Sequence, residues 1–170
     1  MQNLPDKKIS ILLVEDHHVT MEGLRSWIER NPDLQLVGTA STAALAIQLA
    51  RSSKPMITLL DLHLPDNMDV PTAIKELKST GTKVVIFSAE DRKYFVDMAL
   101  KCGAAGFISK SETYGTISKV LREVCFSEGR FLSANLTASS RQHVTDTEKE
   151  LLAMLARGMK YDDIDNVMLT

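Results

Sequence analysis

The sequence has 170 residues and a formal net charge of −2, with 44% hydrophobic and 25% charged residues. These values are typical of a globular protein and give no general attraction to nucleic acid or anionic membranes. No apolar run approaches the roughly 20 residues that span a bilayer, and residues 1–8 lack a signal-peptide core. Cys102 and Cys125 form no metal or redox motif, and such unpaired thiols indicate a reducing compartment. We therefore expect a cytoplasmic protein without membrane contacts.

Short apolar runs alternate with helical patterns five times between residues 9 and 126. The runs predict strands at Ile9–Val14, Leu34–Gly38, Met56–Leu60, Val84–Phe87 and Gly106–Ser109. The segments between them predict helices at Val19–Arg30, from Ser41 or Thr42 to Ala50, and at Val70–Lys78, Asp91–Lys101 and Thr116–Phe126. This alternation predicts the doubly wound α/β class, with a five-stranded parallel sheet covered by helices on both faces.

The rest of the chain departs from this alternation. Residues 128–143 have no sustained apolar period, so we predict a linker there. Thr145-Asp146-Thr147-Glu148 matches a capping box, and the helix that it begins would end at Gly158. A second short helix is predicted at Asp162–Leu169. Two helices of this length cannot enclose much core, so residues 144–170 look like an incomplete all-α unit.

Polar side chains follow four of the five predicted strands. Glu15 and Asp16 follow the first, Asp61 the third, Ser88 the fourth and Lys110 the fifth. The carboxyl ends of parallel strands meet at one edge, where sites form in open α/β sheets. Three carboxylates crowded there repel one another unless a cation is bound, and oxygen ligands suit Mg²⁺. A carboxylate beside a metal ion, a hydroxyl and an ammonium is well suited to accept a phosphoryl group.

Four sequence blocks resemble the receiver domain of bacterial two-component response regulators. The blocks are Val14-Glu15-Asp16-His17, Leu59-Leu60-Asp61-Leu62-His63-Leu64-Pro65, Ile86-Phe87-Ser88-Ala89 and Gly106-Phe107-Ile108-Ser109-Lys110. Their order and separations match the family over about residues 8–127. The resemblance implies a flavodoxin-like fold with strand order 2-1-3-4-5, and a receiver domain over residues 1–127.

The resemblance also implies a role for each acid. Asp61 would accept a phosphoryl group from a sensor histidine kinase or a phosphotransfer protein. Glu15, Asp16, Asp61 and the backbone carbonyl of His63 would bind Mg²⁺. The predicted protein is therefore a signalling switch and not an enzyme.

Four further residues would bind the phosphoryl group or respond to it. By the same resemblance, Ser88 and Lys110 would contact phosphoryl oxygens, and the small Ala89 would leave room for them. Phe107 matches the family's switch aromatic, whose ring turns inward when Ser88 moves toward the phosphoryl group. The alternative for Phe107 is an ordinary buried strand residue with a single conformation.

Each of these residues taken singly has a simpler interpretation. Asp61 and Ser88 could cap a helix or loop, and Lys110 could be a surface lysine. His17 and His18 do not face one ion when they are adjacent at a helix start, so we interpret them as surface or capping residues. It is the joint pattern that favours a site.

The sequence departs from the family pattern after Pro65. Asp66-Asn67-Met68-Asp69 stands where the family usually has two glycines, and its acids could alter metal affinity or partner choice. Asn67 tolerates the left-handed conformation that such a loop needs. Lys110 is followed by Ser111 in place of the common proline, as in the subfamily with a helix-turn-helix output domain.

Residues 144–169 are similar to the first two helices of a LuxR-type (NarL/FixJ-like) DNA-binding domain. The third helix, which enters the major groove in such domains, would follow Thr170. From residue 144 onward there are three basic and six acidic residues, the wrong balance for binding phosphates. We therefore expect promoter binding only in a longer form. Two explanations stay open: this chain is a shortened form of a transcription factor, or it acts through protein contacts. A homodimer is a family-level expectation.

Two rival functions share parts of this pattern. A Mg²⁺-dependent phosphohydrolase also uses a strand-end aspartate, but it typically carries a second aspartate two residues later, where this chain has His63. A pseudo-receiver would dock partners without phosphate, and the intact polar set at the strand ends argues against it. The leading interpretation is a phosphorylatable response regulator that controls a LuxR-type transcriptional output.

Overall fold

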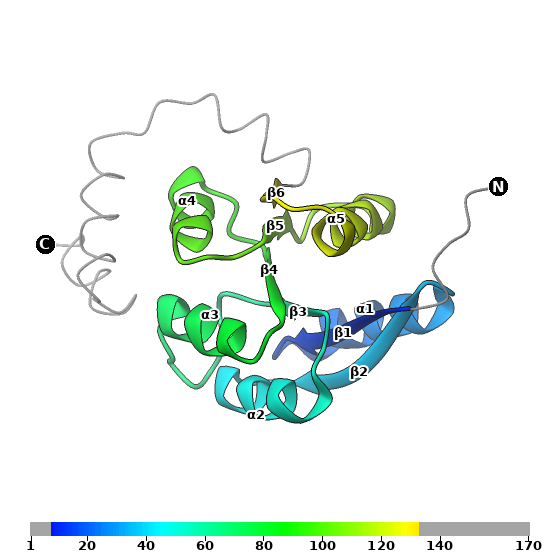
Figure 1. The fold of residues 1–170 in the computed structure, drawn as a ribbon, viewed down its shortest axis with the longest axis horizontal. Helices are drawn as coiled ribbons and strands as arrows, with labels where there is room; N and C mark the ends of the chain where they lie inside the picture. Colours follow the sequence, from blue (N-terminus) through cyan, green and yellow to red (C-terminus); the bar gives the residue numbers. More distant parts are fainter. Residues whose placement is uncertain (1–7, 133–170) are drawn as a thin grey trace, which may run out of the picture.

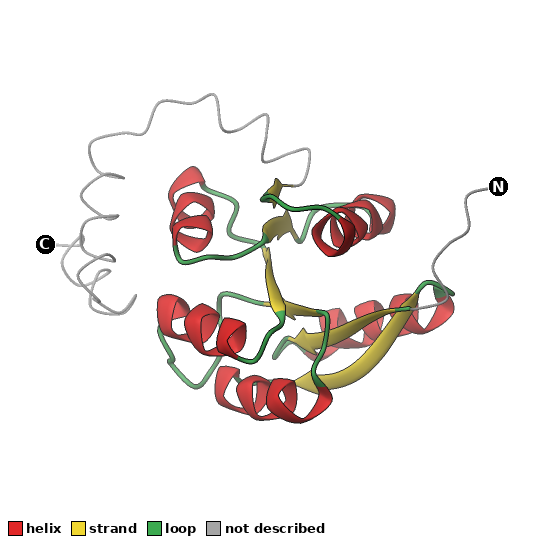
Figure 2. Ribbon diagram, in the orientation of Figure 1, coloured by secondary structure: helices red, strands yellow, loops and turns green. Residues whose placement is uncertain are grey.

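A computed structural model describes residues 8–132 of the chain, which form one parallel sheet with helices on both faces (Figures 1 and 2). The strands are β1 (Ile9–Val14), β2 (Leu34–Ala40), β3 (Ile57–Leu60), β4 (Lys83–Ser88), β5 (Gly106–Ser109) and β6 (Phe131–Leu132). The helices are α1 (His18–Arg30), α2 (Ala43–Ser53), α3 (Val70–Ser79), α4 (Lys93–Lys101) and α5 (Tyr114–Phe126). The predicted unit at residues 144–170 lies outside the described residues. No helix within residues 8–132 has the length and apolar character needed to cross a membrane.

The strands are ordered β2-β1-β3-β4-β5-β6, and every neighbouring pair is parallel. This confirms the predicted order 2-1-3-4-5 and corrects the predicted number of strands. The sixth strand lies inside the segment predicted as a linker, where Phe131 pairs with Gly106 and Leu132 with Phe107. A two-residue strand is too short to produce a hydrophobic period, so its sequence carries no strand signal.

Alternate residues of each strand enter two separate cores, one on each face of the sheet. Helices α2, α3 and α4 cover one core, which contains Leu12, Ile86 and Phe107. Helices α1 and α5 cover the other, which contains Leu59 and Ile108. Because both faces are covered, the central strands are mostly apolar, with Ser10 in β1 and Thr58 in β3 as internal polar residues, and the charged residues stand at or just beyond the strand ends.

The loop between β3 and α3 uses its acids as helix caps. Asp66 Oδ2 accepts a hydrogen bond of 2.9 Å from Ala44 N in the first turn of α2, and Asp69 Oδ1 accepts one of 2.9 Å from Thr72 N in α3. Asn67 has φ 52, the left-handed conformation that the sequence predicted. In residues 8–132 the group of side chains that could hold an ion includes neither Asp66 nor Asp69. These acids therefore position α2 and α3.

Replacing Gly106 with alanine is expected to displace β6 from β5. The added Cβ would lie 2.8 Å from Phe131 O and 3.3 Å from Val124 Cγ2, so the backbone of β6 would have to move. Overpacking of this kind destabilises by about 1–3 kcal/mol. Amide hydrogen exchange at Phe131, whose N–H donates to Ala105 O at 3.0 Å, should become faster. In the control Gly115→Ala the nearest atom is 3.7 Å away, and Phe131 exchange should stay at the wild-type rate; unchanged exchange in both variants would contradict the prediction.

Candidate functional site

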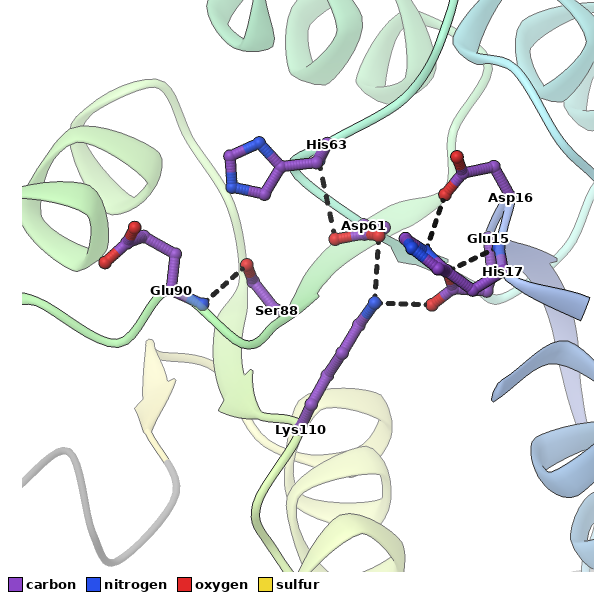
Figure 3. Close-up of polar contacts among 8 residues, drawn as sticks. All are labelled: Glu15, Asp16, His17, Asp61, His63, Ser88, Glu90 and Lys110. Carbon is purple, nitrogen blue, oxygen red and sulfur yellow. Dashed lines mark hydrogen bonds and ion pairs between the residues drawn. The ribbon is translucent and has the colours of Figure 1, made fainter. Parts of the chain in front are cut away.

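Asp61 lies directly after β3, at the carboxyl edge of the sheet between the ends of β1 and β4. Its backbone N–H donates to Val14 O at 3.0 Å, which ties the end of β3 to the end of β1. Its side chain is almost wholly buried, with the residue 4% exposed. Asp61 Oδ2 accepts a hydrogen bond of 2.9 Å from Lys110 Nζ, and Asp61 Oδ1 accepts a long one of 3.4 Å from His63 N (Figure 3). The carboxylate is thus held from both sides.

Lys110 connects two buried carboxylates. Its Nζ lies 2.6 Å from Glu15 Oε2 as well as 2.9 Å from Asp61 Oδ2 (Figure 3). The Lys110 backbone N–H donates to Ser88 O at 2.8 Å, and Glu15 N donates to Ala40 O at 2.9 Å, so both residues continue the sheet beyond the strand ends. Residues from β1, β3 and β5 are therefore brought together as the sequence predicted.

The other oxygen of Glu15 faces Asp16 and His17. His17 Nδ1 lies 3.1 Å from Glu15 Oε1 and 3.0 Å from Asp16 Oδ1 (Figure 3). His17 occupies the N-cap position of α1, but its side chain makes no capping hydrogen bond there. The structure agrees with the predicted surface position, since the His17 side chain is 68% exposed, but the capping hydrogen bond is absent and the ring contacts the acid cluster as well. The sequence signal of these contacts is the pair of acids, Glu15 and Asp16, that immediately precedes His17.

The electrostatics of the site follow from burial and from one shared ammonium. Burial raises the pKa of Asp61, the hydrogen bond and charge of Lys110 oppose that rise, and the charge of Glu15 adds to it; the net direction is upward. Burial lowers the pKa of Lys110, but its contacts with Glu15 and Asp61 outweigh burial and raise the pKa overall. A single ammonium thus compensates the two carboxylates incompletely, which leaves a site that attracts further positive charge.

The acid cluster fits a divalent cation. One ligand atom each from Glu15, Asp16, His17 and Asp61 lies within 4.8 Å of the others. Glu15 Oε2 and Asp16 Oδ1 are buried and accept no well-oriented hydrogen bond, although each touches a charged or ionisable nitrogen. Carboxylate oxygens with unused lone pairs are what Mg²⁺ requires. The backbone of His63 adjoins the cluster through its N–H, and its carbonyl as a ligand stays a prediction.

Ser88, Ala89 and Phe107, the remaining predicted residues, are not among the side chains that make up the acid cluster. Ser88 is fully buried at the end of β4, and its Oγ accepts a hydrogen bond of 3.1 Å from Glu90 N (Figure 3). It does not cap α4, whose N-cap residue is Arg92. Ala89 is exposed beside it. Phe107 is 0% exposed in β5, within the core beneath α2, α3 and α4.

Comparison with known proteins gives the family of the chain. Residues 11–122 match the family model described as the response regulator receiver domain. The chain is 31% identical over 164 residues to the nitrate/nitrite response regulator protein NarL of Escherichia coli K12, which covers 88% of this chain and 76% of that protein. It is 27% identical over 159 residues to the transcriptional regulatory protein DesR of Bacillus subtilis, which covers 92% of this chain and 79% of DesR.

A solved structure agrees with this assignment. The LuxR-family two-component response regulator from Aurantimonas superposes with a TM-score of 0.67 at 27% sequence identity, over 78% of this chain and 95% of that chain. The fold, the placement of the acids at the strand ends and the family match all point the same way. The chain belongs to the response regulator receiver family, with relatives among the NarL- and LuxR-type regulators.

Proposed function

We propose that this protein is the phosphoryl-accepting switch of a two-component pathway, with Asp61 as the acceptor. The observation that carries the proposal is the buried Asp61 carboxylate, joined by Lys110 to Glu15 at the carboxyl edge of the sheet. The donor would be the phosphohistidine of a sensor kinase or a phosphotransfer protein. We further propose that the switch controls a LuxR-type transcriptional output, with promoter binding in a longer form and with a homodimer as the family leads one to expect.

In the transfer step, an Asp61 oxygen would attack phosphorus and form the P–O bond of an acyl phosphate. The P–N bond to the donor imidazole would break, and that nitrogen would keep the electron pair and take up a proton. Glu15, Asp16, Asp61 and the His63 carbonyl would hold Mg²⁺, which neutralises negative charge on the phosphoryl oxygens when bound. The Lys110 ammonium would move from Asp61 to the phosphoryl group, and Ser88 would donate its hydroxyl hydrogen bond to it.

The central test is chemical phosphorylation followed by intact mass. With acetyl phosphate and Mg²⁺ the wild-type chain should gain roughly 80 Da, one phosphoryl group. Asp61→Asn should gain nothing, because the amide cannot form the acyl phosphate. Asp97→Asn is the matched control: Asp97 is a partly exposed α4 residue paired with Lys93 at 2.8 Å, so the adduct should persist. An adduct on Asp61→Asn, or none on the wild type, would overturn the proposal.

The switch can be tested with a phosphoryl mimic. Addition of beryllofluoride and Mg²⁺ should shift the backbone amide resonances of the segment 88–110, because Ser88 would turn from Glu90 N toward the mimic and Phe107 would repack. Resonances of α2, on the far side of the acid cluster from β4 and β5, should move less. If the mimic binds and the amide resonances of this segment do not change, the switch role is contradicted and Phe107 is an ordinary core residue.

A further inference from the structure

The imidazole of His17 is the part of the acid cluster that the proposed mechanism does not use. We propose that His17 is a nitrogen ligand of the cation site, and that it gives the site a preference for first-row transition cations such as Mn²⁺ over Mg²⁺. The proposal rests on the cation site assigned above, and it adds a residue that determines which cation is held. Two observations support it: the spacing of the possible ligand atoms, and the different partners of the two carboxylate oxygens of Glu15.

The two oxygens of Glu15 face different partners. Oε2 lies 2.6 Å from Lys110 Nζ, while Oε1 lies 3.1 Å from His17 Nδ1. Lys110 already supplies the compensating positive charge on its own side of the pocket. His17 is on the opposite side, together with Asp16 Oδ1, a buried oxygen that accepts no well-oriented hydrogen bond. The atoms that could bind a cation, namely Glu15 Oε1, Asp16 Oδ1 and His17 Nδ1, therefore lie close together around the His17 ring.

The spacing of these donors suits one coordination sphere. His17 Nδ1 is 3.1 Å from Glu15 Oε1 and 3.0 Å from Asp16 Oδ1. Adjacent ligands of an octahedral ion with bonds of about 2.1 Å are about 3.0 Å apart. The same two separations therefore fit neighbouring positions around a single cation. Asp61 contributes a fourth donor within 4.8 Å of the others.

The local backbone holds the ring at this place. His17 is extended, with φ −80 and ψ 111, and the helix begins only at His18. Its N–H donates to Glu15 Oε1 at 3.0 Å, which folds the residue back over the glutamate. Contact with the acids alone would contribute little to stability, since the His17 side chain is 68% exposed. The same exposure lets a hydrated cation reach Nδ1 without any movement of the core.

The chemistry of the donors gives the selectivity. Mg²⁺ prefers oxygen ligands and keeps its waters, so an imidazole ligand adds little to the affinity of the site for Mg²⁺. Mn²⁺ also binds carboxylate oxygen, but as a first-row transition ion it accepts an imidazole nitrogen more readily than Mg²⁺ does. Removing the ring should therefore weaken Mn²⁺ binding more than Mg²⁺ binding. Removing even an outer-shell partner of a metal ligand costs about 10–100-fold in affinity, so loss of a direct imidazole ligand should weaken Mn²⁺ binding by at least about tenfold.

The test compares His17→Gln with His18→Ala at one slightly alkaline pH. Mn²⁺ and Mg²⁺ affinities are measured by calorimetry, and pulsed electron paramagnetic resonance of bound Mn²⁺ is used to detect nitrogen coordination. The wild type and His18→Ala should show the imidazole nitrogen coupling. His17→Gln should lose the coupling, and its ratio of Mn²⁺ to Mg²⁺ affinity should fall about tenfold. Circular dichroism of both variants confirms that each is folded.

The outcomes separate this inference from the proposed function. If Mn²⁺ binds the wild type without nitrogen coupling, or if His17→Gln keeps the wild-type affinity ratio, His17 is not a ligand and only this inference fails. If the wild type binds neither ion, the cation site of the proposed function fails with it. Coupling that persists in His17→Gln and disappears in His63→Ala would assign the nitrogen to the other nearby histidine and overturn the role of His17.

Discussion

Replacing Lys110 with alanine is expected to lower the free energy of unfolding by about 2–3 kcal/mol near neutral pH. The substitution leaves the carboxylates of Glu15 and Asp61, which are 1% and 4% exposed, without their shared ammonium. Breaking a fully buried charge pair destabilises by about 3–5 kcal/mol. The expected value is smaller because the Lys110 side chain is 19% exposed and water screens it. Urea denaturation measures the difference.

The stability difference between wild type and Lys110→Ala should depend on pH and on metal, which distinguishes loss of the Lys110 charge from a simple loss of packing. The pKa of Lys110 is raised in the folded protein, so its stabilising contribution is complete below the ordinary value of 10.5 and is lost as the pH rises through the folded value. Wild type and variant should converge in that alkaline range. Added Mg²⁺ should narrow the difference near neutral pH, because a cation compensates the same carboxylates.

The matched control for this prediction is Lys93→Ala. Lys93 Nζ lies 2.8 Å from Asp97 Oδ2, but the two side chains are 27% and 30% exposed and sit one helical turn apart on α4. Such pairs contribute about 0.3–0.5 kcal/mol. Equal losses of stability for the two lysine variants would show that burial of the acid cluster does not determine the role of Lys110.

Replacing Phe107 with alanine is expected to destabilise the protein by about 3–5 kcal/mol, the usual loss for a large aromatic side chain removed from a core. Phe107 is 0% exposed and sits in β5 between Ile86 of β4 and Leu132 of β6. Its removal leaves a cavity that three strands and the helices on that face border. Thermal or urea unfolding reports the loss.

Phe126→Ala provides the comparison, because that ring is 58% exposed at the end of α5. Its replacement should change the free energy of unfolding by less than about 1 kcal/mol. If Phe107→Ala were equally mild, the ring would not contribute close packing to this core. That result would contradict the loss of stability predicted from its complete burial.

The alternation of apolar runs with helical patterns predicts the fold class, and the four sequence blocks that resemble the receiver family supply the strand order and the candidate site residues. Buried parallel strands are mostly apolar, so the charged residues Glu15, Asp16, Asp61 and Lys110, which directly follow them, stand at recognisable places in the pattern. The parallel topology then requires those ends to meet at one edge. The structure adds the contacts among them, in which Lys110 Nζ lies within 2.9 Å of both Glu15 and Asp61.

Features that depend on a distant or non-periodic partner became visible only in the folded arrangement. Strand β6 exists because Gly106 leaves room for the Phe131 carbonyl, a relation between residues far apart in the chain. Asp66 accepts a hydrogen bond from the first turn of α2 and does not join the acid cluster, because the loop after β3 folds onto Ala44. The ring of His17 joins the acids because the extended N-cap backbone turns it toward them. No local periodicity records any of these placements, since each is set by packing between elements.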